Sequence, residues 1–419
     1  MTIACPDCGT LQDLPPLSPR SKAVCRLCCR DLEKTAGRSI TATLACSLAT
    51  FLLLIPSNVF PLIRVELFNM SSANLILVGI GKLWSNQWVL LAGISAVLVI
   101  AIPFIRFGLL SAVLAVLRFT DRRPDWLGPA FRWAVWLDPW AMTDVFLLAS
   151  FVGYYRLINL DAAHVSIEVG GGCFMATGLL TMLSRATLDR RTVWRAIRHE
   201  GKPEPGTQTI SCTTCDLVRP AACEGERCPR CGERLHARKP DAMIRTTALL
   251  IAAAAFVLPA NIFPMEVSSH LGMSQDYTIF TGVRELFEDG LWPLGCIIFC
   301  TSILIPVGKI AVIAWCVLSV WRRSPRHLIA KTKAFRAVAE LGRWSKTDPF
   351  TIVFFVPLVN FGALASATAG WGAMTFMLMS MFTMVASFTF DPRLMWDAAD
   401  AASSLPAPKV HAAAREAPA

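Results

Sequence analysis

The stretch IPSNVFPL, Ile55–Leu62, ends a long apolar run with two prolines and an asparagine. Nearly the same phrase, LPANIFPM, stands at Leu258–Met265. Proline removes a backbone donor and kinks or ends a helix, and a nearby asparagine is expected to bond the carbonyls left free. Such a break either lines a cavity or is ordinary helix termination. The residues of interest are Pro56, Asn58 and Pro61 in the first phrase and Pro259, Asn261 and Pro264 in the second.

The repetition extends far beyond these two phrases. A spacing of 203 residues aligns Pro56 with Pro259 and also Pro103 with Pro306. A spacing of 204 residues aligns WAMTDVF, which begins at Trp140, with WSKTDPF at 344–350. Self-similarity that keeps one register over such a distance predicts a tandem duplication.

The composition indicates a chain whose solvent is partly lipid. Hydrophobic residues make up 54% of its 419 residues and charged residues only 17%, against about 25% charged in ordinary soluble domains. A helix needs about 20 mainly apolar residues to span a bilayer. We predict an α-helical integral membrane protein in which each copy is a zinc ribbon followed by four transmembrane helices. The expected spans are 40–63, 88–117, 141–158 and 169–185 in the first copy, and 245–264, 291–321, 350–368 and 372–390 in the second.

Basic residues gather in alternate loops, and they predict the topology. The net charge is +10, but the lysines and arginines follow the edges of apolar runs without interleaved aromatic residues, which argues against a nucleic-acid partner. The positive-inside rule places these loops in the cytoplasm. Four spans in each copy then put both cysteine-rich segments and both termini on the cytoplasmic side. The basic blocks are 118–132, 185–202, 238–245 and 322–346.

Eight of the 15 cysteines form CxxC pairs with the spacing of metal knuckles. Two such pairs can place four thiolates around one Zn²⁺ at roughly 2.3 Å each. A segment of about 30 residues cannot bury enough apolar surface alone, so a structural metal would supply its folding free energy. Rubredoxin-like iron or a thiol redox role is the alternative. The predicted ligands of two zinc ions are Cys5, Cys8, Cys25 and Cys28 in the first site, and Cys212, Cys215, Cys228 and Cys231 in the second.

Charged residues inside spans are costly and often functional. Arg106 and Lys309 occupy equivalent places in the second spans, and Asp144 and Asp348 occupy equivalent places in the third spans. A cation and a carboxylate on adjacent helices would neutralise each other. They form either a structural ion pair, with snorkelling as a simpler alternative, or a polar relay that couples span movement to proton or substrate binding.

The segments after the two breaks carry apolar residues at helical spacing. We expect short amphipathic helices at the membrane surface, in 71–88 and 276–292. They would receive a lipid, dock a partner domain or pack on their own spans. Their expected apolar faces carry Leu75, Val78 and Leu83 in the first, and Ile279, Val283, Leu286 and Phe287 in the second.

The expected organisation contains no enzyme active site. Phosphate-binding GxxxxGK[ST], zinc-protease HExxH and hydrolase GxSxG motifs are all absent from the sequence. The Ala/Pro-rich C-terminus predicts disorder. The expected segments are a zinc ribbon at 1–38, a four-helix membrane unit at 39–190, a linker with the second ribbon at 191–240, a second membrane unit at 241–392 and a disordered tail at 393–419.

The doubled cysteine ribbon, the PSNVFP and PANIFP phrases and the two WxxTDxF motifs resemble the paraquat-inducible protein A family, over roughly residues 1–392. The resemblance implies a bacterial inner-membrane protein that works with a periplasmic MCE (mammalian-cell-entry) domain protein in lipid or lipophile transport for the outer envelope. Membrane lipids would be further partners. One departure is Pro349, which stands where the first copy has Val145 and suggests that the third span of the second copy begins differently.

Two other classes of function remain open. A membrane-anchored zinc-ribbon stress sensor or scaffold would use the spans only as an anchor. A membrane thiol oxidoreductase would need reactive cysteines on the oxidising side, whereas the predicted topology places the CxxC pairs in the cytoplasm.

Overall fold

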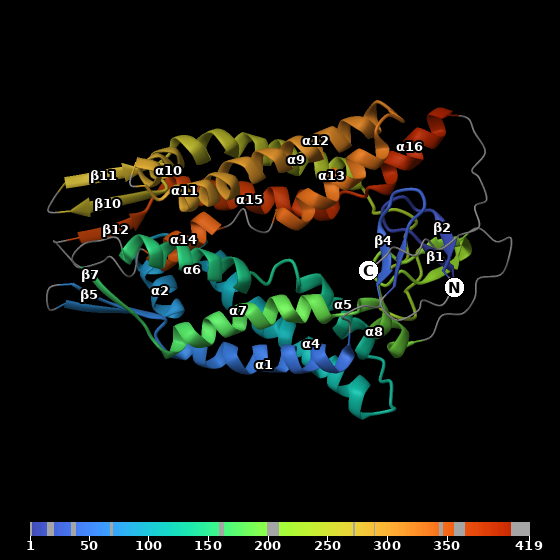
Figure 1. Cartoon of the computed structure of the whole chain (residues 1–419). Coiled ribbons are helices and arrows are strands. Elements are labelled where there is room, and N and C mark those ends of the chain that lie inside the picture. The colour runs from blue at the N-terminus through green and yellow to red at the C-terminus, as the bar shows by residue number, and fades with distance from the viewer. Residues whose placement is uncertain are drawn as a thin grey trace.

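The computed structural model describes residues 2–14, 21–34, 39–67, 70–158, 163–198, 209–270, 273–288, 290–342, 347–355 and 365–403. Two helical units lie side by side, unit 1 (39–198) and unit 2 (241–403) (Figure 1). Small β-sheets stand at one end, and the cysteine-rich hairpins stand at the other. We call these the sheet end and the ribbon end.

Unit 1 begins with a capped helix that tolerates a proline. The side chain of Ser39 accepts a hydrogen bond from the backbone N–H of Ala42 at 3.4 Å. The helix runs through Pro56 and ends two residues before Pro61, where proline prevents its continuation. The elements of unit 1 are α1 (Ile40–Val59), β5 (Ile63–Leu67), β6 (Met70–Asn74), α2 (Ile76–Ser85), α3 (Val89–Ala96), η1 (Val97–Ala101), α4 (Ile102–Phe119), α5 (Leu127–Leu137), α6 (Thr143–Ile158), β7 (Ala163–Ile167), α7 (Val169–Thr187) and α8 (Arg190–Ile197).

Unit 2 repeats this order element by element, which confirms the tandem duplication. Its first helix also contains a proline, Pro259, and ends just before Pro264. The elements of unit 2 are α9 (Ala242–Ile262), β10 (Glu266–His270), β11 (Met273–Tyr277), α10 (Ile279–Glu288), α11 (Trp292–Phe299), η3 (Cys300–Leu304), α12 (Ile305–Trp321), α13 (Leu328–Leu341), α14 (Thr347–Phe355), β12 (Ala365–Ala369), α15 (Trp371–Thr389) and α16 (Arg393–Ser403).

Each unit carries a three-stranded antiparallel sheet at the sheet end, in the orders β6-β5-β7 and β11-β10-β12. The central strand starts directly after the proline break, so Ile63 pairs with Asn74 on one side and Ile167 on the other. In unit 2 the strand β12 lies between the last two expected spans. The expectation that the third span continues as a helix to residue 368 is therefore wrong.

The amphipathic helices after the breaks are confirmed as α2 and α10. Ile279, Val283 and Leu286 are buried as expected. The assignment of Val78 is wrong, because it is 41% exposed and lies off the face that Leu83 shares, whereas Phe287 is 46% exposed but stands one turn after Val283 on the same face. The buried face of α2 instead uses its isoleucines, which lie three and seven residues before Leu83.

A five-residue π-helical segment interrupts the second long helix of each unit at equivalent places, η1 and η3. Each lies just before a proline, Pro103 or Pro306. Proline cannot donate to the carbonyl four residues earlier, and a wider helical turn is one way in which a helix accommodates that loss. The second span is therefore one continuous but irregular helix in both copies.

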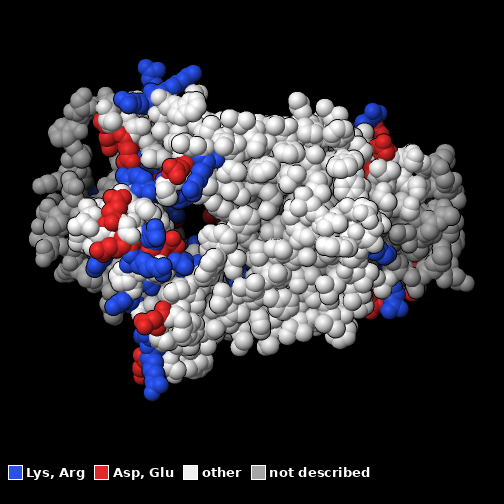
Figure 2. All heavy atoms as spheres, turned by 180° about the vertical axis from the view of Figure 1, so that it is seen from behind, with Lys and Arg blue, Asp and Glu red and all other residues white. Residues whose placement is uncertain are grey.

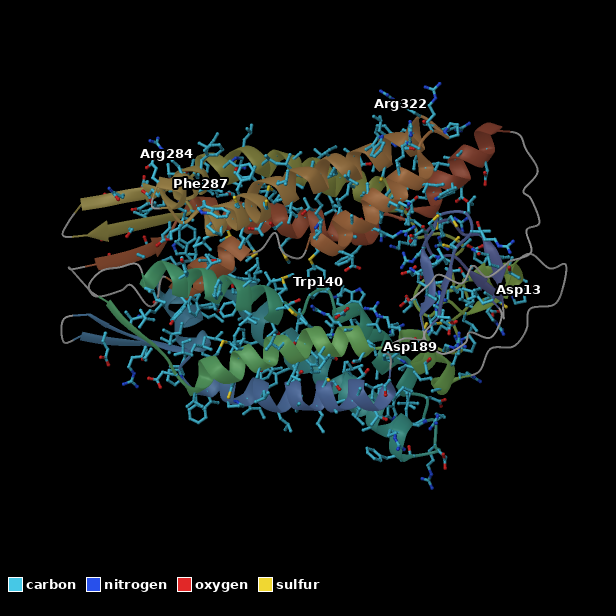
Figure 3. The ribbon with its side chains drawn as sticks, in the orientation of Figure 1. Asp13, Trp140, Asp189, Arg284, Phe287 and Arg322 are labelled. Atoms are coloured by element: carbon cyan, nitrogen blue, oxygen red, sulfur yellow. The ribbon has the colours of Figure 1, made fainter. Side chains whose placement is uncertain are left out.

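The two units meet in the middle of the molecule through aromatic packing between α6 and α14. The ring of Phe146 lies 5.9 Å from that of Phe350 and 6.3 Å from that of Phe354. Trp140 extends the interface, with its ring 5.8 Å from that of Phe388 (Figure 3). These contacts belong to one buried apolar core that both units share.

Five helices in the described residues are long and apolar enough to cross a membrane. A broad band almost without charged side chains separates the charged ends of the molecule (Figure 2). The protein is thus a multi-pass membrane protein. The five helical spans are Ile40–Val59, Val89–Phe119, Ala242–Ile262, Trp292–Trp321 and Trp371–Thr389.

One expectation about segment boundaries is wrong and another stays a prediction. The described part of α14 starts at Thr347, directly after residues 343–346, which lie outside the described part of the chain, so a different beginning of this span at Pro349 stays a prediction. The predicted disordered tail at 393–419 begins with the helix α16, while residues 404–419 lie outside the described part of the chain.

Candidate functional site

The first cysteine cluster forms between two hairpins, β1 (Thr2–Ala4) with β2 (Leu11–Asp13), and β3 (Lys22–Val24) with β4 (Asp31–Lys34). The Sγ atoms of Cys5 and Cys28 are 3.4 Å apart, and those of Cys8 and Cys25 are 3.6 Å apart. A tetrahedral site with bonds of about 2.3 Å has sulfur–sulfur edges of about 3.8 Å. The four buried sulfurs therefore fit one tetrahedral metal ion.

The second cluster repeats this geometry beside the hairpin of β8 (Thr209–Ser211) and β9 (Val218–Pro220), which the 3-10 turn η2 (Ala221–Cys223) follows. The Sγ distances are 3.5 Å for Cys212 to Cys231 and 3.5 Å for Cys215 to Cys228. We call the two metal-binding segments ribbon 1 (2–34) and ribbon 2 (209–237).

The glycines after two of the knuckles adopt a backbone conformation that glycine favours. Gly9 has φ +77° and Gly232 has φ +72°, a left-handed region that other residues seldom adopt. The side chain of Gln12 adds support by donating to Cys25 Sγ at 2.9 Å while its oxygen accepts from the Arg26 backbone N–H. Backbone geometry and a neighbouring amide therefore support the shape of the knuckles.

A buried ionic network occupies the ribbon end of unit 1. Asp138 accepts from Arg106 at 2.6 Å, from Arg185 at 2.9 Å and from Arg190 at 2.7 Å, and Arg185 also pairs with Asp144. Burial alone would raise the pKa of Asp138, but the three guanidinium groups lower it far below its usual range. Arg106 therefore pairs directly with Asp138, and Asp144 pairs with Arg185 in the same network.

The sequence comparison missed Asp138 and Arg185 because their counterparts in unit 2 carry no charge. Gly342 stands in place of Asp138 at the spacing of 204 residues, and Ser387 stands in place of Arg185 at the spacing of 202 that aligns α7 with α15. A search for charges shared by both copies therefore discards them. The useful signal was an acidic and a basic residue that occur in only one of the two copies.

Unit 2 buries a single cation at the equivalent position. Lys309 on α12 is 1% exposed, and its Nζ would lie 2.5 Å from a Cβ added to Gly342. The glycine therefore leaves the space that the ammonium group occupies. The side chain of Asp348 and residues 343–346 lie outside the described part of the chain, so the pairing of Lys309 with Asp348 stays a prediction.

The two proline phrases pack against glycines at the start of the last helix in each unit. A Cβ on Gly170 would lie 2.3 Å from the carbonyl oxygen of Phe60, and one on Gly372 would lie 2.4 Å from that of Phe263. The backbone N–H of Gly170 donates to Pro61 O at 3.1 Å. The backbone of the break therefore packs on a helix N-terminus and is bonded to it, while the side chains of Val59 and Phe60 are exposed.

The asparagines of these phrases bond a different carbonyl from the predicted one. Asn58 Nδ2 donates to Leu54 O at 2.7 Å, and Asn261 makes the equivalent bond at 2.8 Å. The carbonyl that Pro56 leaves without a backbone donor belongs to Leu52, four residues earlier. The asparagines therefore reinforce the last turn of each helix and do not repair the proline defect.

An apolar groove of about 480 Å³ opens between α6 and α7 of unit 1. One end lies at Asp144 and the other at Leu62 and Ile63, beside the first proline break. Phe354 of unit 2 forms part of the wall, and its ring packs where Gly153 leaves space. The walls between these ends are almost entirely hydrocarbon, so the groove suits an elongated apolar ligand.

The family profile described as Paraquat-inducible protein A matches residues 40–198 and 243–400. The chain belongs to the paraquat-inducible protein A family. It is 31% identical to the intermembrane transport protein PqiA of Escherichia coli K12, over 94% of this chain and 95% of that protein. It is 28% identical to the lipophilic envelope-spanning tunnel protein A of the same strain, over 94% and 91%. No solved structure matches the chain.

Proposed function

We propose that the protein is the inner-membrane subunit of an intermembrane transport system that moves a lipid or another lipophile and maintains the outer envelope. The apolar groove of unit 1 carries this proposal. Between Asp144 and Tyr154 it follows ten residues of helix, or about 15 Å, which is half of a hydrocarbon core of about 30 Å. One acyl chain of a single leaflet fits that length.

The orientation follows from the charge distribution. Basic residues gather at the ribbon end, so this end and both termini face the cytoplasm and the sheet end faces the periplasm. The periplasmic partner is an MCE-domain protein, as the family resemblance implies. The named relatives, one an intermembrane transport protein and one an envelope-spanning tunnel protein, support such an assembly.

Each ribbon would hold one structural Zn²⁺ through its four cysteines, because the donor set is all sulfur and the sulfur spacing suits a tetrahedron. The metal supplies folding free energy to a segment with little core of its own. Metal analysis of the purified chain should give about two zinc ions per chain. Iron in place of zinc, or fewer than one ion, contradicts this assignment.

A polar relay in unit 2 would couple the spans to proton or substrate binding. Lys309 is buried within a span, and Asp348 stands on the helix equivalent to that of Asp144. A charge that can be neutralised inside a low-dielectric bundle changes the balance between helix arrangements. Replacing Lys309 or Asp348 with alanine should abolish transport at normal protein level. Arg106 and Asp144 of unit 1 would serve the relay as a fixed, neutralised counterpart.

Filling the groove tests the transport proposal directly. Leu179 lines the groove and is 64% exposed, whereas Leu183 on the same helix is 48% exposed and lies outside it. Leu179→Trp should remove the detergent resistance that the protein confers on its host, and Leu183→Trp should leave it intact. Full resistance with Leu179→Trp at normal protein level would favour an anchored sensor or scaffold.

A further inference from the structure

Each ribbon packs its apolar side chains on the opposite membrane unit, although Arg195 of α8 in unit 1 also pairs with Glu33 of ribbon 1 at 2.9 Å. Ribbon 1 precedes unit 1 in the chain, yet its cysteines share a buried apolar cluster with side chains from α9, α12, α13 and α16 of unit 2. Ribbon 2 precedes unit 2, yet it shares a cluster with α1, α4, α5 and α8 of unit 1. The chain therefore crosses over itself twice at the ribbon end.

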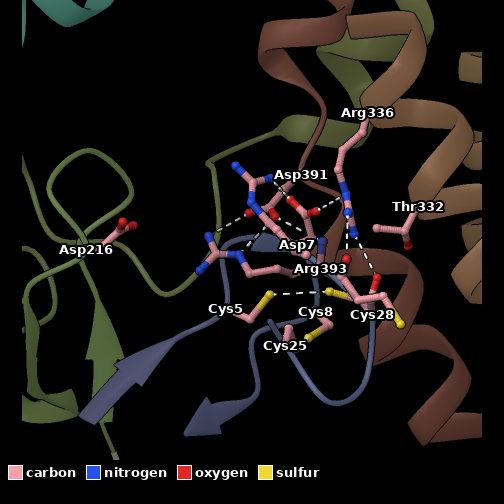
Figure 4. Close-up of polar contacts among 12 residues, drawn as sticks. Cys5, Asp7, Cys8, Cys25, Cys28, Asp216, Thr332, Arg336, Asp391 and Arg393 are labelled. Carbon is pink, nitrogen blue, oxygen red and sulfur yellow. Dashed lines mark hydrogen bonds and ion pairs between the residues drawn. The ribbon is translucent and has the colours of Figure 1, made fainter. Parts of the chain in front are cut away.

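The contact between ribbon 1 and unit 2 depends on atoms of the metal knuckles themselves. Arg336 of α13 donates through Nη2 to the backbone oxygen of Cys28 at 2.9 Å, and its Nε lies 2.6 Å from Asp7 Oδ2 (Figure 4). The carboxylate of Asp7, between Cys5 and Cys8, is only 5% exposed and also pairs with Arg30. Both acceptors are in place only while the cysteine knuckles keep their shape.

The contact between ribbon 2 and unit 1 also uses a knuckle. A Cβ on Gly128 of α5 would lie 1.9 Å from the backbone oxygen of Arg230, which stands between Cys228 and Cys231. On the next turn of α5, Arg132 pairs with Glu233 at 3.1 Å. Because Gly128 has no side chain, the knuckle of Cys228 and Cys231 packs directly against the backbone of α5.

We propose that each metal-tied ribbon is a strap that orders the ribbon end of the opposite membrane unit. Ribbon 1 holds α13 and α16 in place, and ribbon 2 holds α5 and α8. Loss of metal from one ribbon unfolds its knuckles, removes the acceptors described above and loosens the other unit. This inference rests on the metal binding proposed above and is independent of transport.

The two ends of the molecule hold the units together in different ways. At the ribbon end each unit is tied to a segment that belongs covalently to the other copy. At the sheet end, the described strands form two separate three-stranded sheets that share no strand. There the units meet through side chains, as in the contact of Trp88 with Trp371, whose rings are 5.2 Å apart.

Hydrogen exchange of the purified full-length chain, read peptide by peptide with metal content measured on the same sample, tests the crossing. Cys5→Ser with Cys8→Ser should leave one metal per chain and raise exchange at least about tenfold in 328–341 and 393–403. The matched pair Cys212→Ser with Cys215→Ser should instead raise exchange in 127–137 and 190–197. Faster exchange in a ribbon's own unit, or equally in both, overturns the inference, and no metal in the wild type overturns the metal assignment.

A second variant separates docking from metal loss. Arg336→Leu keeps all eight cysteines, so metal content should stay at the wild-type value while exchange rises in α13 and in ribbon 1. The matched control is Arg132→Leu on α5, which should change only unit 1 and ribbon 2. Unchanged exchange in α13 with Arg336→Leu would refute the role of ribbon 1 as a strap.

Discussion

Replacing Asp138 with asparagine should destabilise unit 1 by the cost of a buried, unpaired guanidinium. The substitution keeps the shape and removes the charge that three arginines share. Arg190 is 49% exposed and can turn to water, so its lost pair contributes less than about 1 kcal/mol. Arg106 is 1% exposed and cannot reach water. Leaving such a buried charge without its partner costs about 3–5 kcal/mol. Arg185 keeps its pair with Asp144 and adds little.

The assay is equilibrium unfolding in detergent micelles, with hydrogen exchange of 102–119 to locate the change. Asp138→Asn should lower the free energy of unfolding by about 3–5 kcal/mol. Adding Arg106→Met should recover at least half of that loss, because the stranded charge is then gone. Asp125→Asn, an exposed carboxylate in the preceding loop, is the control and should change stability by less than about 0.5 kcal/mol. A double variant no more stable than Asp138→Asn would refute the reasoning.

Three further outcomes are expected. Gly128→Ala should destabilise the chain by about 1–3 kcal/mol and release ribbon 2, seen as faster exchange in 209–237, because the new Cβ would meet Arg230 O at 1.9 Å. Gly170→Ala should cost a similar amount but act at the sheet end, with faster exchange in 60–67 and no change in metal content. Burial alone would raise the pKa of Asp391, yet bonds and charge from Arg393 lower it, so its contribution is present above about pH 4 and lost as the pH falls further. The stability difference between wild type and Asp391→Asn should therefore shrink below about pH 4.

The sequence predicted the features that depend on local pattern. Apolar runs marked the spans and the CxxC spacing marked both cysteine clusters, because hydropathy and knuckle geometry are properties of short segments. The strands at the sheet end escaped prediction for the same reason. Segments such as MSSAN and EVSSH lack the alternating β-branched and aromatic residues that signal a strand, and pairing within a sheet orders them.

The crossed docking of the ribbons and the ionic network escaped prediction for a different reason. Two copies of one sequence offer nearly the same helix faces, so the pattern does not say which copy receives which ribbon. Single residues decide it in the structure. Gly128 has no side chain, so the backbone oxygen of Arg230 in ribbon 2 can pack against it, whereas Arg336 binds the carboxylate of Asp7 in ribbon 1. Ribbon 2 carries Thr214 where ribbon 1 carries Asp7, and Arg230 where ribbon 1 carries Leu27, so the two ribbons are not interchangeable.

Divergence between the copies also assigns them different mechanical roles. In unit 1, Asp138 pairs with both Arg106 and Arg185, and breaking such a buried ionic network is costly. In unit 2 the same positions carry Gly342 and Ser387, and the buried cation Lys309 fills space that a side chain would otherwise take. A duplicated bundle that needed only rigidity would have no reason to keep a buried lysine where the acid was lost. In the relay proposed above, the ionic network makes unit 1 the static half, and a change of charge in unit 2 moves the spans against it.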